Sequence, residues 1–75
     1  MMDSFEIERL IRQLIPDAHV DVRDLTGGGD HFELNIKSSA FKGKSLVEQH
    51  RLVYQALGEA MNGPIHAVQI ITQAV

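Results

Sequence analysis

The spacing of apolar residues changes along this chain, and these changes constrain its fold more than any single motif does. Near the N-terminus, apolar residues recur at the three- and four-residue intervals of one helix face: Ile7, Leu10, Ile11 and Leu14. Asp3 can cap this helix, with Glu6 three residues later as the return half of a capping box. Pro16 ends the helix, because its ring disfavours helical geometry for the residue before it.

Two segments that follow alternate apolar and polar residues with a period of two. The pattern spans residues 19–23 and residues 31–37. Each segment predicts a strand with one buried and one solvated face. Residues 26–30, which include three consecutive glycines, join them. The pattern therefore predicts an antiparallel hairpin with a flexible loop, longer than the tight two-residue type.

A short turn is expected at residues 38–41, followed by a longer helix. Ser45 caps this helix, and Glu48 completes a second capping box. The helix should stop at residues 62–64, because Gly63 suits a left-handed C-cap and Pro64 cannot continue a helix. Its expected apolar stripe contains Leu46, Val53, Leu57 and Ala60, flanked by Val47, Tyr54 and Met61.

The last apolar run, from Ile65 to Thr72, is rich in Ile and Val and predicts a strand with apolar residues on both faces. Such a strand is more typical of the centre of a sheet than of its edge. The order of elements is then α-β-β-α-β. Two helices on one face of a three-stranded sheet would give an α+β sandwich, and residues 1–75 would form a single domain.

Composition limits the chemistry that this chain can perform alone. It contains no cysteine, so any thiolate ligand or nucleophile must come from a partner. The sequence shows no Ser–His–Asp arrangement and no convergent carboxylate pair, so we do not expect an enzyme. No apolar run approaches the ~20 residues that span a bilayer. The acidic N-terminus lacks a signal-peptide pattern, and we expect a cytoplasmic protein with no membrane role.

Charge is distributed unevenly along the chain. Residues 1–36 hold three arginines and eight acidic residues, whereas residues 37–51 hold four cations and one acid, although the whole chain carries −3. The four cations of that segment are Lys37, Lys42, Lys44 and Arg51. A local basic patch on an acidic protein is a weaker indication of nucleic-acid binding than a basic domain would be.

Two glycine-containing segments resemble phosphate-binding loops only superficially. Residues 43–45 read Gly-Lys-Ser, but the phosphate-loop motif needs a glycine where Ser38 stands. Residues 27–29 are all glycine, yet they lead into a strand rather than into a helix N-terminus. The first segment is better explained as a turn and a helix cap. The second is either a plain linker or a mobile loop that carries His31 to a ligand.

The four histidines occupy different settings. His19 lies on the solvated face of the first strand, and His50 shares the apolar stripe of the main helix, which predicts a core histidine. His31 opens the second strand and His66 opens the last one. Each of these two is either an ordinary surface histidine or a metal ligand, and on neighbouring strands they could converge. Two histidines cannot complete a tetrahedral site, so a second molecule would have to supply the remaining ligands.

Two stretches of sequence resemble the BolA-like family. The first is Phe41-x-Gly43-x-Ser45 running into Gln49-His50-Arg51-Leu52-Val53-Tyr54, and the second is Ile65-His66-Ala67-Val68. The resemblance implies that the last strand completes a mixed sheet, as in the class II KH-like fold. The chain departs from many relatives in having Gln49 where they have Arg, and in ending at Val75 where they continue into a charged tail.

The resemblance also implies a function. In the family, the histidine that opens the last strand, here His66, is implicated in binding a [2Fe–2S] cluster shared with a monothiol glutaredoxin. His31 matches the second ligand, and the glutaredoxin cysteine and a glutathione thiol would complete the centre. This implies an adaptor in iron–sulfur cluster trafficking or iron-linked regulation. The apo protein is expected to hold no cofactor and to be a monomer or weak homodimer.

A second function follows from the same resemblance. BolA-like proteins are also described as transcriptional regulators, and here DNA would contact Lys37, Lys42, Lys44 and Arg51. The turn before the main helix lacks the Gly-x-x-Gly clamp by which KH domains hold single strands.

Overall fold

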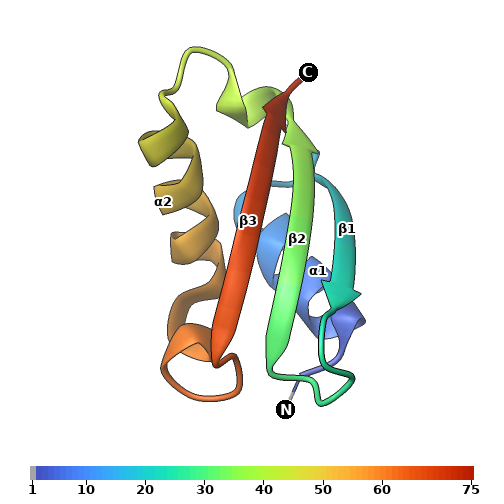
Figure 1. Cartoon of the computed structure of the whole chain (residues 1–75). Helices are drawn as coiled ribbons and strands as arrows, with labels where there is room; N and C mark the ends of the chain where they lie inside the picture. The colour runs from blue at the N-terminus through green and yellow to red at the C-terminus, as the bar shows by residue number, and fades with distance from the viewer. Residues whose placement is uncertain (1) are drawn as a thin grey trace.

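The chain folds in the order that the apolar spacing predicts (Figure 1). The computed structural model describes residues 2–75. Its elements are α1 (Ser4–Leu14), β1 (His19–Asp24), β2 (His31–Ser38), the 3-10 turn η1 (Ser39–Phe41), α2 (Leu46–Leu57), the 3-10 turn η2 (Gly58–Asn62) and β3 (Ala67–Ala74). The predicted cap of the first helix is confirmed, since the Asp3 carboxylate accepts the Glu6 N–H at 2.9 Å, but the return bond from Asp3 N–H to the Glu6 side chain is not formed. Ser45 and Glu48 form the complete capping box predicted for the main helix.

The sheet is mixed, with the order β1-β2-β3. β1 and β2 form the predicted antiparallel hairpin, with Val22 opposite Leu34, and β3 runs parallel to β2, with Ile70 opposite Leu34. The expectation that the last strand is central is therefore wrong, because β2 is central and β3 lies at an edge. Apolar residues on both faces of β3 do not mean burial on both faces: Ile70 is buried, but Ile71 is 43% exposed.

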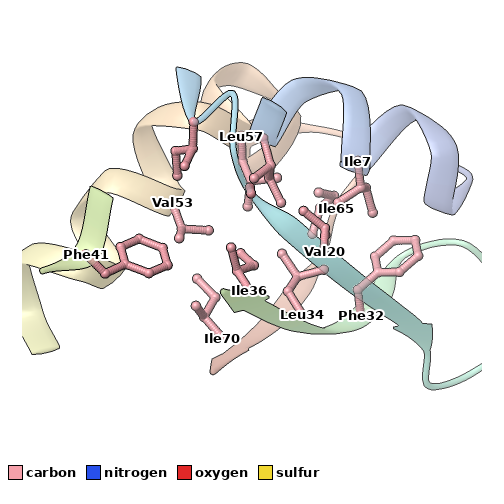
Figure 2. Packing of buried hydrophobic residues seen from close by; sticks show 13 residues of the cluster. Ile7, Val20, Phe32, Leu34, Ile36, Phe41, Val53, Leu57, Ile65 and Ile70 are labelled. Atoms are coloured by element: carbon pink, nitrogen blue, oxygen red, sulfur yellow. The ribbon is translucent and has the colours of Figure 1, made fainter. Parts of the chain in front are cut away.

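The core lies between the sheet and the two helices, which cover one face (Figure 2). Ile7 and Ile11 of α1 are fully buried, as predicted, but Leu14 is 46% exposed, and Ile15, just after the helix, is buried. The remaining large core side chains come from the sheet, η1, α2 and the segment before β3: Val20, Phe32, Leu34, Ile36, Phe41, Val53, Leu57, Ile65 and Ile70.

The apolar stripe predicted for the main helix is only partly buried. Val53 and Leu57 are buried, whereas Leu46 is 62% exposed. The first turn of α2 is held by a polar side chain instead: the Gln49 amide donates to the Lys44 carbonyl at 3.0 Å and accepts from the Thr72 hydroxyl at 2.5 Å. Leu46 thus shares a helix face with the core residues but lies outside the core.

The main helix also ends earlier than predicted. The α-helix stops at Leu57, and the chain continues through η2 before Gly63 and Pro64. Gly58 has a φ of 54°, in the left-handed region that glycine tolerates best. The α-helix therefore breaks at Gly58, four residues before the Asn62-Gly63-Pro64 sequence that was expected to stop it.

A single carboxylate joins three segments at the opposite end of the sheet from the glycine-rich loop. Asp17, in the link between α1 and β1, accepts hydrogen bonds from the Ser38 hydroxyl at 2.5 Å, from the Ser39 N–H at 3.0 Å and from the Ser39 hydroxyl. The bond from the Ser38 hydroxyl contributes most to a lowered pKa of Asp17. Together these bonds lower that pKa to about 2. The folded state therefore favours the ionised form of Asp17.

Within the described residues, no helix is long and apolar enough to cross a membrane.

The burial of Leu57 predicts a large effect of its truncation. Leu57→Ala should lower the free energy of unfolding by about 2–4 kcal/mol, because it opens a cavity in a small aliphatic core. Ser45→Ala should lower it by only about 1 kcal/mol, through the lost helix cap. Urea denaturation of both variants measures the difference, and a larger loss for Ser45→Ala would contradict this account of α2.

The lowered pKa of Asp17 predicts an acid-sensitive contribution to stability. A carboxylate whose pKa is lower in the folded state stabilises the fold above its unfolded pKa, about 3.9, and loses that contribution as the pH falls toward 2. Urea midpoints measured from pH 7 to pH 2 should therefore fall less steeply below pH 4 for Asp17→Asn than for wild type. Asp21→Asn, at an exposed position of β1, is the control and should follow the wild-type curve. Parallel curves for all three proteins would refute the role of Asp17.

Candidate functional site

The structure brings His31 and His66 together at one end of the sheet. Their ring centroids lie 5.3 Å apart and the ring planes differ by 4°, so the two imidazoles are stacked. The convergence that their positions in the sequence allow is therefore observed. His31 is the first residue of β2, whereas His66 lies one residue before β3, which starts at Ala67 rather than at Ile65.

Parallel pairing of β2 and β3 explains this meeting. Two parallel neighbours begin at the same end of a sheet, and here His31 pairs with Ala67. The Asp30 carbonyl accepts the His66 N–H at 2.7 Å and the Ala67 N–H at 3.2 Å, which ties the entry of β3 to the entry of β2. Ile65, immediately before, is buried in the core. The His66 backbone is therefore held between a core anchor and a strand.

The glycine-rich loop before His31 has internal hydrogen bonds. The Asp24 carboxylate accepts the N–H groups of Thr26 at 3.2 Å, Gly27 at 2.8 Å and Gly29 at 2.9 Å. Gly27 and Gly29 have φ values of 77° and 74°, which favour glycine. The loop is thus organised around Asp24, where the sequence predicted a flexible link. The bond from the Thr26 N–H to Asp24, two residues earlier, is that of an Asx turn, which Asp favours, so this anchor was detectable in the sequence.

Both imidazoles are open to a partner. The His31 side chain is 38% exposed, and His66 is exposed. The Asp30 carboxylate lies 3.8 Å from His31 Nε2, which is too long for a hydrogen bond but close enough to attract a positive charge on that ring. The site therefore consists of two nitrogen donors and a neighbouring carboxylate on the surface.

The geometry sets a condition on metal binding. A metal lies in the plane of each imidazole that binds it, and two stacked parallel planes share no such point. At least one ring must turn before both can bind one ion. Across residues 2–75, no group of three or more His, Cys, Asp or Glu side chains is arranged to hold a metal. The pair can contribute to a metal centre only if another molecule supplies further ligands.

The other two histidines lie away from any such pairing. His19 is exposed on the outer face of the sheet, as predicted. His50 is only half-buried, so the prediction of a core histidine is wrong. It lines a surface groove on α2 with Val47, Arg51 and Tyr54, because the helix rotates this side away from the buried Val53 and Leu57.

The four cations considered for nucleic-acid binding are all exposed but do not share one surface. Lys42 and Lys44 lie in the loop between η1 and α2, and Arg51 lies on α2. Lys37 alternates with the buried Ile36 and Ser38, so it points to the sheet face away from the helices. The structure therefore places Lys37 on the uncovered sheet face and Arg51 on the helical side of the domain.

Comparison with known proteins gives consistent matches over most of the chain. The family model described as BolA-like protein matches residues 11–75. The uncharacterized protein RP812 of Rickettsia prowazekii is 36% identical over 70 residues, covering 93% of this chain and 91% of that protein. Protein BOLA2 of Arabidopsis thaliana is 38% identical over 71 residues, covering 93% of this chain and 75% of that protein. The solved BolA domain of SufE1 from Arabidopsis thaliana has a TM-score of 0.85 at 30% identity, over 99% of this chain and 95% of that one.

The hydrogen bonds to Asp24 predict that its removal loosens the loop beside His31. In Asp24→Ala, the amides of Gly27 and Gly29 should exchange with solvent about tenfold faster, because each loses a charge-assisted hydrogen bond. Hydrogen exchange followed by NMR measures this, and amides in the middle of β2 should keep their protection. Asp21→Ala is the matched control. Unchanged exchange at both glycines in Asp24→Ala would show that the loop is organised by other contacts.

Proposed function

Because the chain belongs to the BolA-like family, we propose that it is a non-enzymatic adaptor that binds a monothiol glutaredoxin and co-ligates a shared [2Fe–2S] cluster. His66 and His31 are the proposed ligands. The single observation that carries this proposal is the stacked, exposed pair that these two residues form in a chain without cysteine. Such a chain can offer nitrogen but no thiolate, so it suits a centre whose sulfur ligands come from elsewhere.

The two histidines suit a metal centre shared with another molecule, not one bound by this chain alone. Two imidazoles leave at least two ligand positions unfilled, and the glutaredoxin cysteine and a glutathione thiol would fill them. A bound [2Fe–2S] cluster would supply one-electron chemistry, at a potential raised by nitrogen ligation relative to all-cysteine ligation. The protein's own part is to present two nitrogens at a fixed end of the sheet.

The two ligands differ in how firmly they are held. His66 follows the buried Ile65, and its N–H is bonded to the Asp30 carbonyl, so its backbone position is defined before a partner arrives. His31 follows the loop organised by Asp24, and its ring is the one beside the Asp30 carboxylate. We therefore assign His66 as the primary ligand and His31 as the second.

The alternative, a nucleic-acid-binding regulator, has less support. The cations that it needs are divided between the sheet face and the helical side, and the chain carries a net charge of −3. A protein that tracks a phosphate backbone concentrates its cations on one surface.

The proposal predicts different consequences for the histidine variants. The protein is mixed with a monothiol glutaredoxin, glutathione, iron and sulfide, and the heterodimer is followed by its visible absorption and circular dichroism. His66→Ala should lose the heterodimer-specific spectrum, because no cysteine in this chain can replace the lost donor. His31→Ala should retain the heterodimer but bind the cluster more weakly. His19→Ala, at an exposed histidine elsewhere on the sheet, is the matched control.

The melting temperatures of the apo variants serve as a control for unfolding. His66→Ala should melt near the wild-type temperature, because the exposed His66 contributes little packing. An unaltered spectrum in His66→Ala would overturn the shared-cluster assignment. In that case, steeply salt-dependent binding to duplex DNA would make Lys42 and Lys44 the better guide to function.

A further inference from the structure

The outer edge of β3 is a row of backbone groups without partners. The N–H groups of Ala67 and Val75 donate to the carbonyls of Asp30 and Ser38, so the odd-numbered residues of this segment direct their backbone toward β2. Because backbone direction alternates along a strand, the even-numbered residues face the opposite way. These residues are Val68, Ile70, Thr72 and Ala74. β3 pairs with β2 alone, so in the described structure their N–H and C=O groups point to a free edge.

This edge lacks the features by which proteins keep sheet edges from pairing. Such edges are usually short, or carry charges or proline. β3 has eight residues, and from Ala67 to Val75 the sequence contains no charge, no proline and no glycine. The other edge of the same sheet is different: β1 has six residues, three of which are Asp21, Arg23 and Asp24. Only the β3 edge is chemically open to another strand.

We propose that β3 pairs antiparallel with β3 of a second copy of this chain, about a two-fold axis at Ile71. In this register Ile71 faces its own counterpart, Gln69 faces Gln73, Ile70 faces Thr72 and Val68 faces Ala74. The even-numbered residues form the hydrogen-bonded pairs, which uses every free backbone group of β3. Ile71 then falls at a non-hydrogen-bonded pair, where opposing side chains approach most closely.

The sequence of β3 favours a second copy over an unrelated peptide. A two-fold strand pair places each residue opposite a residue of the same strand, so any charge in the strand would risk a like-charge contact. β3 carries none of the chain's ten acidic or seven basic residues. Ile71, which is 43% exposed on the uncovered sheet face, would be covered by its counterpart, and the flanking glutamines can exchange side-chain hydrogen bonds.

The proposed dimer does not depend on the cluster function. Its axis lies at Ile71, and the two-fold operation places the two His31–His66 pairs at opposite ends of the joined sheet. One strand pair buries less surface than a standard stable interface, so the dimer should be weak. We expect a dissociation constant roughly between micromolar and millimolar.

Sedimentation equilibrium from roughly 10 μM to 1 mM tests the proposal on the apo protein. Wild type should show a monomer–dimer equilibrium. Ile71→Lys should weaken it by on the order of tenfold, because it places two ammonium groups opposite one another at the axis. His19→Lys adds the same charge to the same sheet face at the β1 edge and should dimerise like wild type. Circular dichroism confirms that each variant is folded.

A charge exchange tests the register itself. Ile71→Lys and Ile71→Glu should each dimerise less than wild type when alone, and a mixture of the two should form a heterodimer more readily than either forms a homodimer. In wild type, NMR hydrogen exchange should show the amides of Ile70 and Thr72 becoming more protected as concentration rises, with no change at Val22. A wild-type protein that stays monomeric to 1 mM, or an Ile71→Lys protein that dimerises like wild type, would overturn the proposal. Failure here leaves the cluster proposal untouched, because that is tested at His66.

Discussion

Parallel pairing of β2 with β3 determines the position of α2, the uncovered face of the sheet and the meeting of His31 with His66. Two parallel neighbours cannot be joined by a tight turn, so the chain must cross from the end of β2 to the start of β3 through α2. The crossover places α2 beside α1 on one face of the sheet and leaves the other face uncovered (Figure 1). It also returns the chain to the end of the sheet where β2 begins. That return is what brings His66 to His31.

Polar side chains hold this crossover where apolar packing is thin. Asp17 binds the two serines at which β2 ends and the crossover begins, and Gln49 binds both the loop before α2 and Thr72 on β3. No buried side-chain nitrogen or oxygen in residues 2–75 lacks a hydrogen-bond partner. A 75-residue domain has a small apolar core, so such bridges can decide the orientation of elements that the core alone would leave loosely defined.

Apolar spacing predicted which residues share a face, but not whether that face is covered. For α1 the two agree, since Ile7 and Ile11 are buried. Leu46 shares a face with Val53 and Leu57, yet it is 62% exposed, and the first turn of α2 is held by the polar contacts of Gln49 instead. Ile71 stays exposed because no layer packs on that side of the sheet. Spacing is a local property, whereas coverage depends on the crossover, which links residues far apart in the sequence.

The candidate site was predictable to a similar degree. The placement of His31 and His66 at strand starts was visible in the sequence, but their meeting required that the two strands be parallel neighbours, which only the family resemblance implied. The turn at Asp24 was detectable from residue type, but the bonds from the His66 and Ala67 N–H groups to the Asp30 carbonyl depend on strand placement that no periodicity encodes. His50 was misplaced for the same reason as Leu46, because its apolar neighbours in sequence do not all face the core.

The histidine pair and the free edge of β3 lie on one continuous strand, and this limits what can occupy them together. Ile71 is five residues from His66, or about 16 Å along an extended strand. A partner interface of standard size covers about 800 Å² on each protein, which corresponds to a patch of roughly 16 Å radius. A partner centred on the histidines therefore reaches the edge near Ile71 unless it approaches from beyond the strand starts. The uncharged edge of β3 would then serve a second copy or the flank of a cluster-sharing partner, and the direction of approach would decide which.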